Sequence, residues 1–201
     1  CSGGIGESIS KTFIDYGAKV YGFDIKSNNN LNEYSDNFIF IDCDLLNFDL
    51  FKSKCLEIFH KESKIDILIN NAGITIPKKN SMYDLKDWRR TLDINLTIPF
   101  MCSQIAFELM KKNNAGSIVN ITSLVAELGF PDNPAYGASK GGLKALSKAN
   151  ASEWGKFGVR VNCIGPGYIG EGMTKKSYDN NVTKIIVITG KGLRSKNIFN
   201  P

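Results

Sequence analysis

Apolar and polar positions along the chain form a pattern in which short apolar runs alternate with stretches of helical spacing. Runs rich in β-branched and aromatic residues predict strands over residues 19–24, 38–42, 65–70, 117–122 and 159–164. Apolar residues at helical spacing predict helices over about residues 4–16, 48–61, 84–113 and 134–157, the third irregular near Pro99. Strands that alternate with helices of this length need parallel crossovers. The sequence therefore predicts an α/β fold, a doubly wound and mostly parallel sheet flanked by helices.

Composition and charge support a single globular domain and exclude several classes of protein. The chain has 201 residues, of which 42% are hydrophobic and 22% charged, so it can bury a core of its own. Its net charge of +5 is spread out, with no basic stripe before the last thirty residues, so we do not expect a nucleic-acid partner. No apolar run reaches the roughly 18 residues of a membrane span, and no secretory signal opens the chain. We therefore expect a cytoplasmic protein that has no membrane partner.

Cysteine and histidine usage argues against a metal site. The five cysteines show no CxxC spacing and are predicted to be small buried side chains in a reducing compartment: Cys1, Cys43, Cys55, Cys102 and Cys163. The single histidine, His60, lies in a Lys- and Glu-rich stretch, so a zinc site or a His-based catalytic triad is not expected.

A glycine-rich turn opens the first predicted helix. Gly3, Gly4 and Gly6 surround Ile5, and small residues here let the backbone approach a pyrophosphate, whose charge the start of a helix favours. Asp24 ends the next predicted strand, where a carboxylate can accept both ribose hydroxyls of NAD and would repel the 2′-phosphate of NADP. These positions predict a dinucleotide site that prefers NAD. An ordinary glycine turn and a turn aspartate are the alternatives.

A second turn follows a buried strand and has the composition Asn-Ala-Gly. Asn71, Ala72 and Gly73 come directly after the strand that ends at Asn70. Ligands of doubly wound sheets bind outside the carboxyl ends of the strands, so this turn is expected to present backbone and amide groups to a cofactor. An ordinary strand-ending turn is the alternative.

A serine, a tyrosine and a lysine are the candidate catalytic residues. Tyr136 and Lys140 are four residues apart and so share one helix face, while Ser123 lies just past the end of a predicted strand. A phenol has a pKa near 10, and a nearby ammonium stabilises phenolate and lowers that pKa, which suits the tyrosine to proton transfer. A serine hydroxyl can hold a substrate oxygen beside it. Tyrosine and lysine at this spacing also occur by chance, so the interpretation rests on all the motifs together.

Together these motifs resemble the short-chain dehydrogenase/reductase family over about 169 of the 201 residues. The fold implied is Rossmann-like. The glycine turn, from Ser2 to Gly6, resembles the back of the family's TGxxxGxG motif. The other positions that the resemblance assigns to the cofactor are Asp44 and Leu45 at the adenine, Asn71, Ala72 and Gly73, Tyr136 and Lys140, and Pro166, Gly167 and Ile169 at the nicotinamide.

The resemblance also implies a reaction, namely reversible hydride transfer between NAD(H) and a carbonyl or secondary alcohol. Tyr136 would exchange the proton, Lys140 would bind the nicotinamide ribose, and Ser123 would orient the carbonyl. Asn95 would anchor a proton relay at an irregularity of its helix. NAD is expected, with NADP less so because Gly3 fills a position where relatives that prefer NADP carry Arg or Lys. The two long helices are where relatives pair into homodimers and homotetramers, although their apolar residues could equally be core.

Both ends of the chain depart from the pattern of the family. The strand and Thr-Gly that normally precede the glycine turn would lie before Cys1, so we expect that the first strand is missing and that the chain is a fragment. Residues 1–169 are predicted to form the catalytic domain, and residues 170–201 an atypical or truncated segment. Glu171 stands where relatives usually place a Thr, and Lys184–Thr189 is strand-like. Residues 185–195 look somewhat like part of a Smr-type nuclease domain.

These departures leave two alternatives to an active oxidoreductase. Glu171 and the shortened C-terminal part are compatible with a truncated or inactive protein that binds a dinucleotide without turnover. The basic residues near the end are compatible with a nucleic-acid-binding module, which the rest of the chain does not favour.

Overall fold

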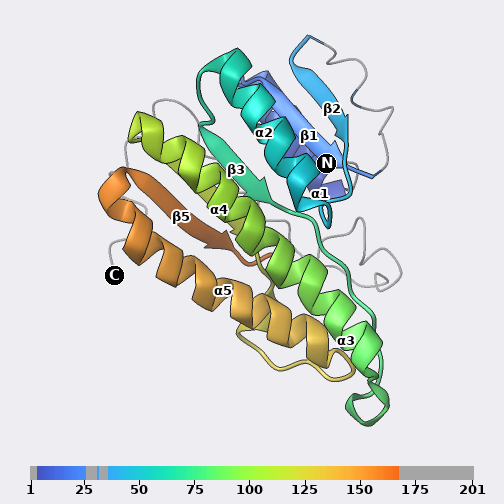
Figure 1. Ribbon diagram of the computed structural model, residues 1–201. Helices are drawn as coiled ribbons and strands as arrows, with labels where there is room; N and C mark the ends of the chain where they lie inside the picture. The colour runs from blue at the N-terminus through green and yellow to red at the C-terminus, as the bar shows by residue number, and fades with distance from the viewer. Residues whose placement is uncertain (1–3, 26–30, 32–35, 168–201) are drawn as a thin grey trace.

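The computed structural model describes residues 4–25, 31 and 36–167 (Figure 1). Several predictions therefore lie outside the described residues, namely those for Cys1, Ser2, Gly3, Ile169, Glu171 and the segment 170–201. Among the residues that the structure describes, no helix is long and apolar enough to cross a membrane.

The described strands are all parallel, as expected, and form two hydrogen-bonded sheets. In the first sheet β1 (Val20–Asp24) pairs with β2 (Phe38–Asp42). The second sheet has the order β3 (Ile67–Asn70), β4 (Gly116–Ile121) and β5 (Val159–Ile164). Within the described part of the chain no strand is hydrogen-bonded between β1 and β3. The expectation of a further, central strand before Cys1 stays a prediction.

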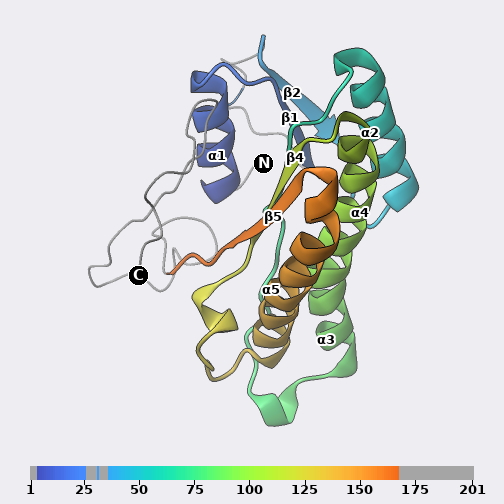
Figure 2. The same cartoon turned by 90° about the vertical axis from the view of Figure 1, so that its left-hand side faces the viewer.

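The helices cover the strands on both sides, which confirms the doubly wound α/β fold. Figure 2 shows α1 (Gly4–Asp15) on one side and α2 (Phe48–Glu62), α4 (Ile98–Met110) and α5 (Pro134–Trp154) on the other. Asn47 caps α2 by accepting a hydrogen bond from the amide of Leu50, and such caps fix where a helix begins. The crossovers from β2 to β3, from β3 to β4 and from β4 to β5 each contain a helix.

The predicted long helix over 84–113 is divided by a π-turn. It consists of α3 (Leu85–Leu92), the π-turn Asp93–Thr97 and then α4. Proline has no N–H, and its ring would clash with the carbonyl four residues earlier, which here belongs to Asn95. In the π-turn the amide of Ile98 instead reaches the carbonyl of Asp93, five residues back. The irregularity therefore lies before Pro99, and it contains Asn95.

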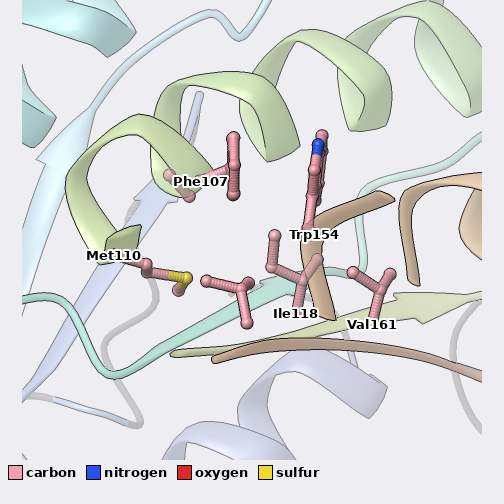
Figure 3. Close-up of a cluster of buried hydrophobic side chains, with 7 residues drawn as sticks. Phe107, Met110, Ile118, Trp154 and Val161 are labelled. Atoms are coloured by element: carbon pink, nitrogen blue, oxygen red, sulfur yellow. The ribbon is translucent and has the colours of Figure 1, made fainter. Parts of the chain in front are cut away.

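Two hydrophobic clusters hold the helices on the sheets. In the first, residues of α4, α5, β4 and β5 pack together, and the rings of Phe107 and Trp154 stack with their centroids 4.5 Å apart (Figure 3). The second cluster joins α2 and α4 beside the β1–β2 sheet and includes buried Cys43, Cys55 and Cys102. Ile65 and Leu68 pack against both clusters, so the two sheets share one continuous core.

The prediction of buried cysteines is confirmed for these three residues and is wrong for Cys163. That residue is exposed at the carboxyl end of β5, beyond the positions Val159 and Val161 that α5 covers.

Candidate functional site

The parallel register brings three strand ends to one edge of the second sheet. Asn70 of β3, Asn120 of β4 and Cys163 of β5 lie in register. The segments that follow these residues therefore emerge side by side, as expected for a ligand site of this fold. Backbone hydrogen bonds join two of the segments, since the amide of Leu124 donates to the carbonyl of Pro166 at 3.0 Å.

Ser123 lies at this edge, directly after β4. Its hydroxyl accepts a hydrogen bond from the amide of Val125 at 3.3 Å and caps the short 3-10 helix Leu124–Ala126. Its side chain also interacts with that of Tyr136 of α5, because it lowers the pKa of the phenol. The structure thus brings together two of the predicted catalytic side chains, which lie in different elements.

Lys140 follows Tyr136 by one turn of α5 and is almost fully buried, with 3% of its surface exposed. Its Nζ donates to the carbonyl of Ile121 at 2.7 Å, at the end of β4. The same Nζ lies 5.8 Å from the centroid of the Tyr136 ring. The two side chains therefore share one helix face and both face the sheet edge.

Burial dominates the electrostatics of both groups. It lowers the pKa of Lys140 from 10.5 to about 8, because the low-dielectric interior disfavours the ammonium. It raises the pKa of Tyr136, and the interaction with Ser123 opposes that rise. The expected lowering of the Tyr136 pKa by Lys140 is not found, because burial of the phenol raises that pKa and outweighs the opposing interaction with Ser123.

Asn95 is fully buried in the π-turn and ties it to the turn after β3. Its Nδ2 donates to the carbonyl of Ile74, and its Oδ1 accepts from the amide of Ile74, both at 2.8 Å. Nδ2 also donates to Ser139 Oγ at 3.1 Å. A Cβ atom on Gly73 would lie 3.2 Å from Asn95 Oδ1 and 3.5 Å from Lys140 Nζ, so only glycine permits this packing without adjustment. The structure thus assembles Asn95, Gly73 and Lys140.

The residues predicted for the other end of a dinucleotide occupy the first sheet and α1. Gly4, Ile5 and Gly6 form the first turn of the 12-residue helix α1. Asp24 ends β1, where its Oδ1 accepts from the amide of Ile25. This donor set fits a dinucleotide, because small residues and helical N–H groups suit a pyrophosphate and a carboxylate at a strand end suits ribose hydroxyls.

Asp44 and Leu45 follow β2, and their surroundings differ. Asp44 is exposed, and its Oδ1 accepts from the amide of Leu46 at 3.0 Å. Leu45 is half-buried against the second hydrophobic cluster. The structure therefore leaves Asp44 open to a ligand and gives Leu45 a role in the core.

Sequence reasoning missed Ser139, which stands directly before Lys140. Its side chain is fully buried and hydrogen-bonds with Asn95 and with the carbonyl of Tyr136. Its spacing of three residues from Tyr136 is a signal that it faces the same side of the helix. The buried amide network of Asn70 and Asn120 was also missed, because it depends on contacts between distant segments.

A family model described as short chain dehydrogenase matches residues 1–182 of the chain. The 2-dehydro-3-deoxy-D-gluconate 5-dehydrogenase of Bacillus subtilis strain 168 is 35% identical over 182 residues, 88% of this chain and 71% of that protein. The 3-oxoacyl-(acyl-carrier-protein) reductase FabG of Rickettsia typhi is 36% identical over 188 residues, 92% of this chain and 76% of that protein. The chain spans only 53% and 42% of two further relatives.

Solved structures share the fold at similar identity. ElxO with NADP bound has a TM-score of 0.81 and 25% identity, over 88% of this chain and 74% of that chain. A 4-hydroxyisoleucine dehydrogenase complexed with NADH has a TM-score of 0.77 and 31% identity, over 88% of this chain and 76% of that chain. The relatives are oxidoreductases, and together they support NAD(P)-dependent oxidoreduction.

Proposed function

The chain belongs to the short-chain dehydrogenase/reductase family, and we propose that it transfers a hydride between NAD(H) and a carbonyl or secondary alcohol. The observation that carries this proposal is the meeting of Ser123 and Tyr136 at the sheet edge, with buried Lys140 one turn along the same helix. When bound, the nicotinamide supplies or accepts the hydride.

Tyr136 exchanges the proton with the substrate oxygen, and Ser123 holds that oxygen beside the phenol. The support is the interaction between the two side chains, through which Ser123 lowers the pKa of Tyr136, since it places a donor and a proton-transfer group within reach of one oxygen atom. In carbonyl reduction the neutral phenol gives its proton to the developing alkoxide. The raised pKa of Tyr136 keeps the phenol protonated for this step at neutral pH.

Lys140 and Asn95 organise the space around Tyr136. The Lys140 Nζ lies between the end of β4 and Gly73, where it can donate to a nicotinamide ribose. Asn95 hydrogen-bonds with the backbone of Ile74 through both Oδ1 and Nδ2. It thereby fixes the position of the turn after β3 and anchors a proton relay. The roles of both residues rest on the family resemblance and on these contacts.

We propose NAD as the cofactor, bound by the glycine turn (Ser2 to Gly6), Asp24, Asp44 and Leu45 at its adenosine end. Asn71, Ala72, Gly73, Pro166, Gly167 and Ile169 would contact its other half. The carboxylate of Asp24 at the end of β1 favours ribose hydroxyls over a 2′-phosphate. Of the related structures, one holds NADP and another NADH, so the preference rests on Asp24.

The substrate class is a small carbonyl or alcohol. Relatives are named for a sugar acid and for an acyl-carrier ketone, and both chemistries present a carbonyl next to polar groups. We also propose a cytoplasmic homodimer or homotetramer that forms through α3–α4 and α5. An open groove of about 570 Å³ runs along α3, and its lining includes apolar Leu85 and Ile94 beside Arg89 and Asp93, which could pair with a second copy.

The test is NADH-linked turnover over a panel of keto sugar acids and 3-oxoacyl thioesters. Tyr136→Phe removes the proton donor and is expected to lower kcat by about 100-fold or more, since general acid catalysis contributes roughly 10²–10⁴. Tyr16→Phe serves as the control because Tyr16, directly after α1, is 72% exposed. Equal rates for wild type and Tyr136→Phe would refute the role of Tyr136 as the proton-transfer group. NADH binding without any turnover would favour the alternative of a dinucleotide-binding protein.

A further inference from the structure

Ser139 both donates and accepts a hydrogen bond inside the protein. Its side chain is completely buried. The hydroxyl donates to the carbonyl of Tyr136 at 2.8 Å and accepts from Asn95 Nδ2 at 3.1 Å. One small side chain thereby joins the helical turn that carries the proton-transfer group to the π-turn that precedes α4.

The contacts continue beyond Asn95 to the turn after β3. The other N–H of Asn95 Nδ2 and its Oδ1 are both used by the backbone of Ile74. Gly73, the preceding residue, would place a Cβ atom 3.5 Å from Lys140 Nζ. A chain of hydrogen bonds therefore runs from α5 through Ser139 and Asn95 to the Ile74 turn, where Gly73 leaves space beside Lys140 of α5.

We propose that Ser139 is a positioning residue, whose hydroxyl fixes the Asn95 amide and, through it, the Ile74 turn relative to Tyr136 and Lys140. This inference rests on the proposed function of that site. A buried amide N–H that loses its acceptor is unfavourable, so without the hydroxyl the Asn95 side chain turns toward another acceptor and its bonds to Ile74 weaken.

The same helix supplies a matched control in Ser147. Ser147 is 3% exposed, donates to the carbonyl of Leu143 at 2.7 Å and accepts from Asn120 Nδ2 at 2.7 Å. Ser147→Ala thus leaves a buried asparagine amide without its acceptor, as Ser139→Ala does. Its partner Asn120 lies within β4 and bonds to Asn70, whose other side-chain hydrogen bonds go to Pro99 and Ser103 and not to the backbone of Ile74. Comparable losses of thermal stability are expected for both variants.

The first measurement is hydrogen exchange at the amide of Ile74, which donates to Asn95 Oδ1. Exchange in Ser139→Ala is expected to be about tenfold faster than in wild type, because the opening of this turn becomes easier. Exchange in Ser147→Ala is expected to be unchanged. Unchanged exchange in Ser139→Ala, or equal acceleration in both variants, would overturn the proposal. This readout does not depend on turnover, so it separates the inference from the proposed function.

The second measurement is a kinetic double-mutant cycle with Asn95. Ser139→Ala alone is expected to lower kcat about tenfold and leave the KM for NADH unchanged, whereas Ser147→Ala leaves both unchanged. In an Asn95→Ala background, Ser139→Ala is expected to have no further effect on kcat, because it acts through Asn95. Full additivity of the two substitutions would contradict a role through Asn95. Absence of turnover in the wild type would refute the proposed function, and the exchange experiment would then decide the positioning role alone.

Discussion

The ammonium of Lys140 is buried in the protein interior, where the loss of hydration disfavours its charge. Burial lowers its pKa to about 8, and the contact that stabilises its Nζ in the described structure is the carbonyl of Ile121. A shift of this size corresponds to about 3 kcal/mol of unfavourable free energy for the charged form at neutral pH. The site thus keeps a destabilising charge where the proposed reaction needs a donor to the ribose.

Lys140→Met is therefore expected to raise the free energy of unfolding at pH 7 while it abolishes turnover. The gain is about 2 kcal/mol once about 1 kcal/mol is subtracted for the lost hydrogen bond to Ile121. Urea denaturation at pH 7 measures the gain. A variant less stable than the wild type at this pH would contradict this account of the buried charge.

The pH dependence of stability gives an independent check on the same group. Folding lowers the pKa of Lys140 from 10.5 to about 8, so between these values the unfolded chain binds more protons than the folded chain. The contribution of Lys140 to the free energy of unfolding therefore rises from pH 8 to pH 10.5. The advantage of Lys140→Met over the wild type should shrink across that interval.

At the scale of elements, the π-turn Asp93–Thr97 and the turn after β3 are fitted to each other. Asn95 binds the backbone of Ile74 on both sides of its amide, and the absence of a side chain at Gly73 makes the approach possible. The sequence predicted a turn at residues 71–73 and an irregular helix near Pro99, but it did not show that the two segments bind each other, because they lie far apart in the chain.

Gly73→Ala is expected to reduce kcat by about tenfold or more and to lower stability by only about 1 kcal/mol. The added Cβ atom would lie 3.2 Å from Asn95 Oδ1, and the hydrogen bonds of the Asn95 amide to Ile74 and Ser139 restrict the movement of that side chain. Gly141→Ala is the control, because a Cβ atom there meets nothing within 4 Å. In the middle of α5 this control should raise stability by about 0.5–1 kcal/mol and leave kcat unchanged. Equal kcat in both variants would contradict the close fit of the two turns.

The observed bounds of the strands show how accurately the local sequence pattern predicts them. The predicted strands over 38–42 and 159–164 agree with β2 and β5. The strand predicted over 65–70 begins two residues later, at Ile67, because Ile65 packs between the two hydrophobic clusters instead of pairing. Periodicity locates an apolar segment well, whereas the residue at which pairing begins depends on the neighbouring strand.

At the scale of the whole molecule, two sheets depend on one core. Leu68 of β3 packs against both hydrophobic clusters, and α4 contributes residues to each of them. We therefore expect the described region to unfold as one unit, although its strands form two separate hydrogen-bonded sheets.

Leu68→Ala is expected to lower the free energy of unfolding by about 2 kcal/mol and to preserve a single transition, because the cavity touches both clusters. In a Trp88→Phe background, Trp154 fluorescence reports the first cluster and circular dichroism reports all the helices, so the two unfolding curves should coincide. Leu128→Ala, at a position that is 51% exposed, should change little. Two separated transitions would show that the sheets are stabilised independently.

The sequence by itself determined the alternation of strands and helices, the parallel fold and the set of catalytic candidates. Each of these follows from the spacing of residues close together in the sequence. For example, Lys140 follows Tyr136 by four positions, which places both side chains on one helix face. Only the tertiary structure decided what surrounds those groups: the Ile121 carbonyl that holds Lys140, the burial that raises the pKa of Tyr136, and the Ser139 hydroxyl behind Asn95. The reason is physical, because burial and hydrogen-bond partners come from segments distant in sequence, and local spacing does not encode which of them meet.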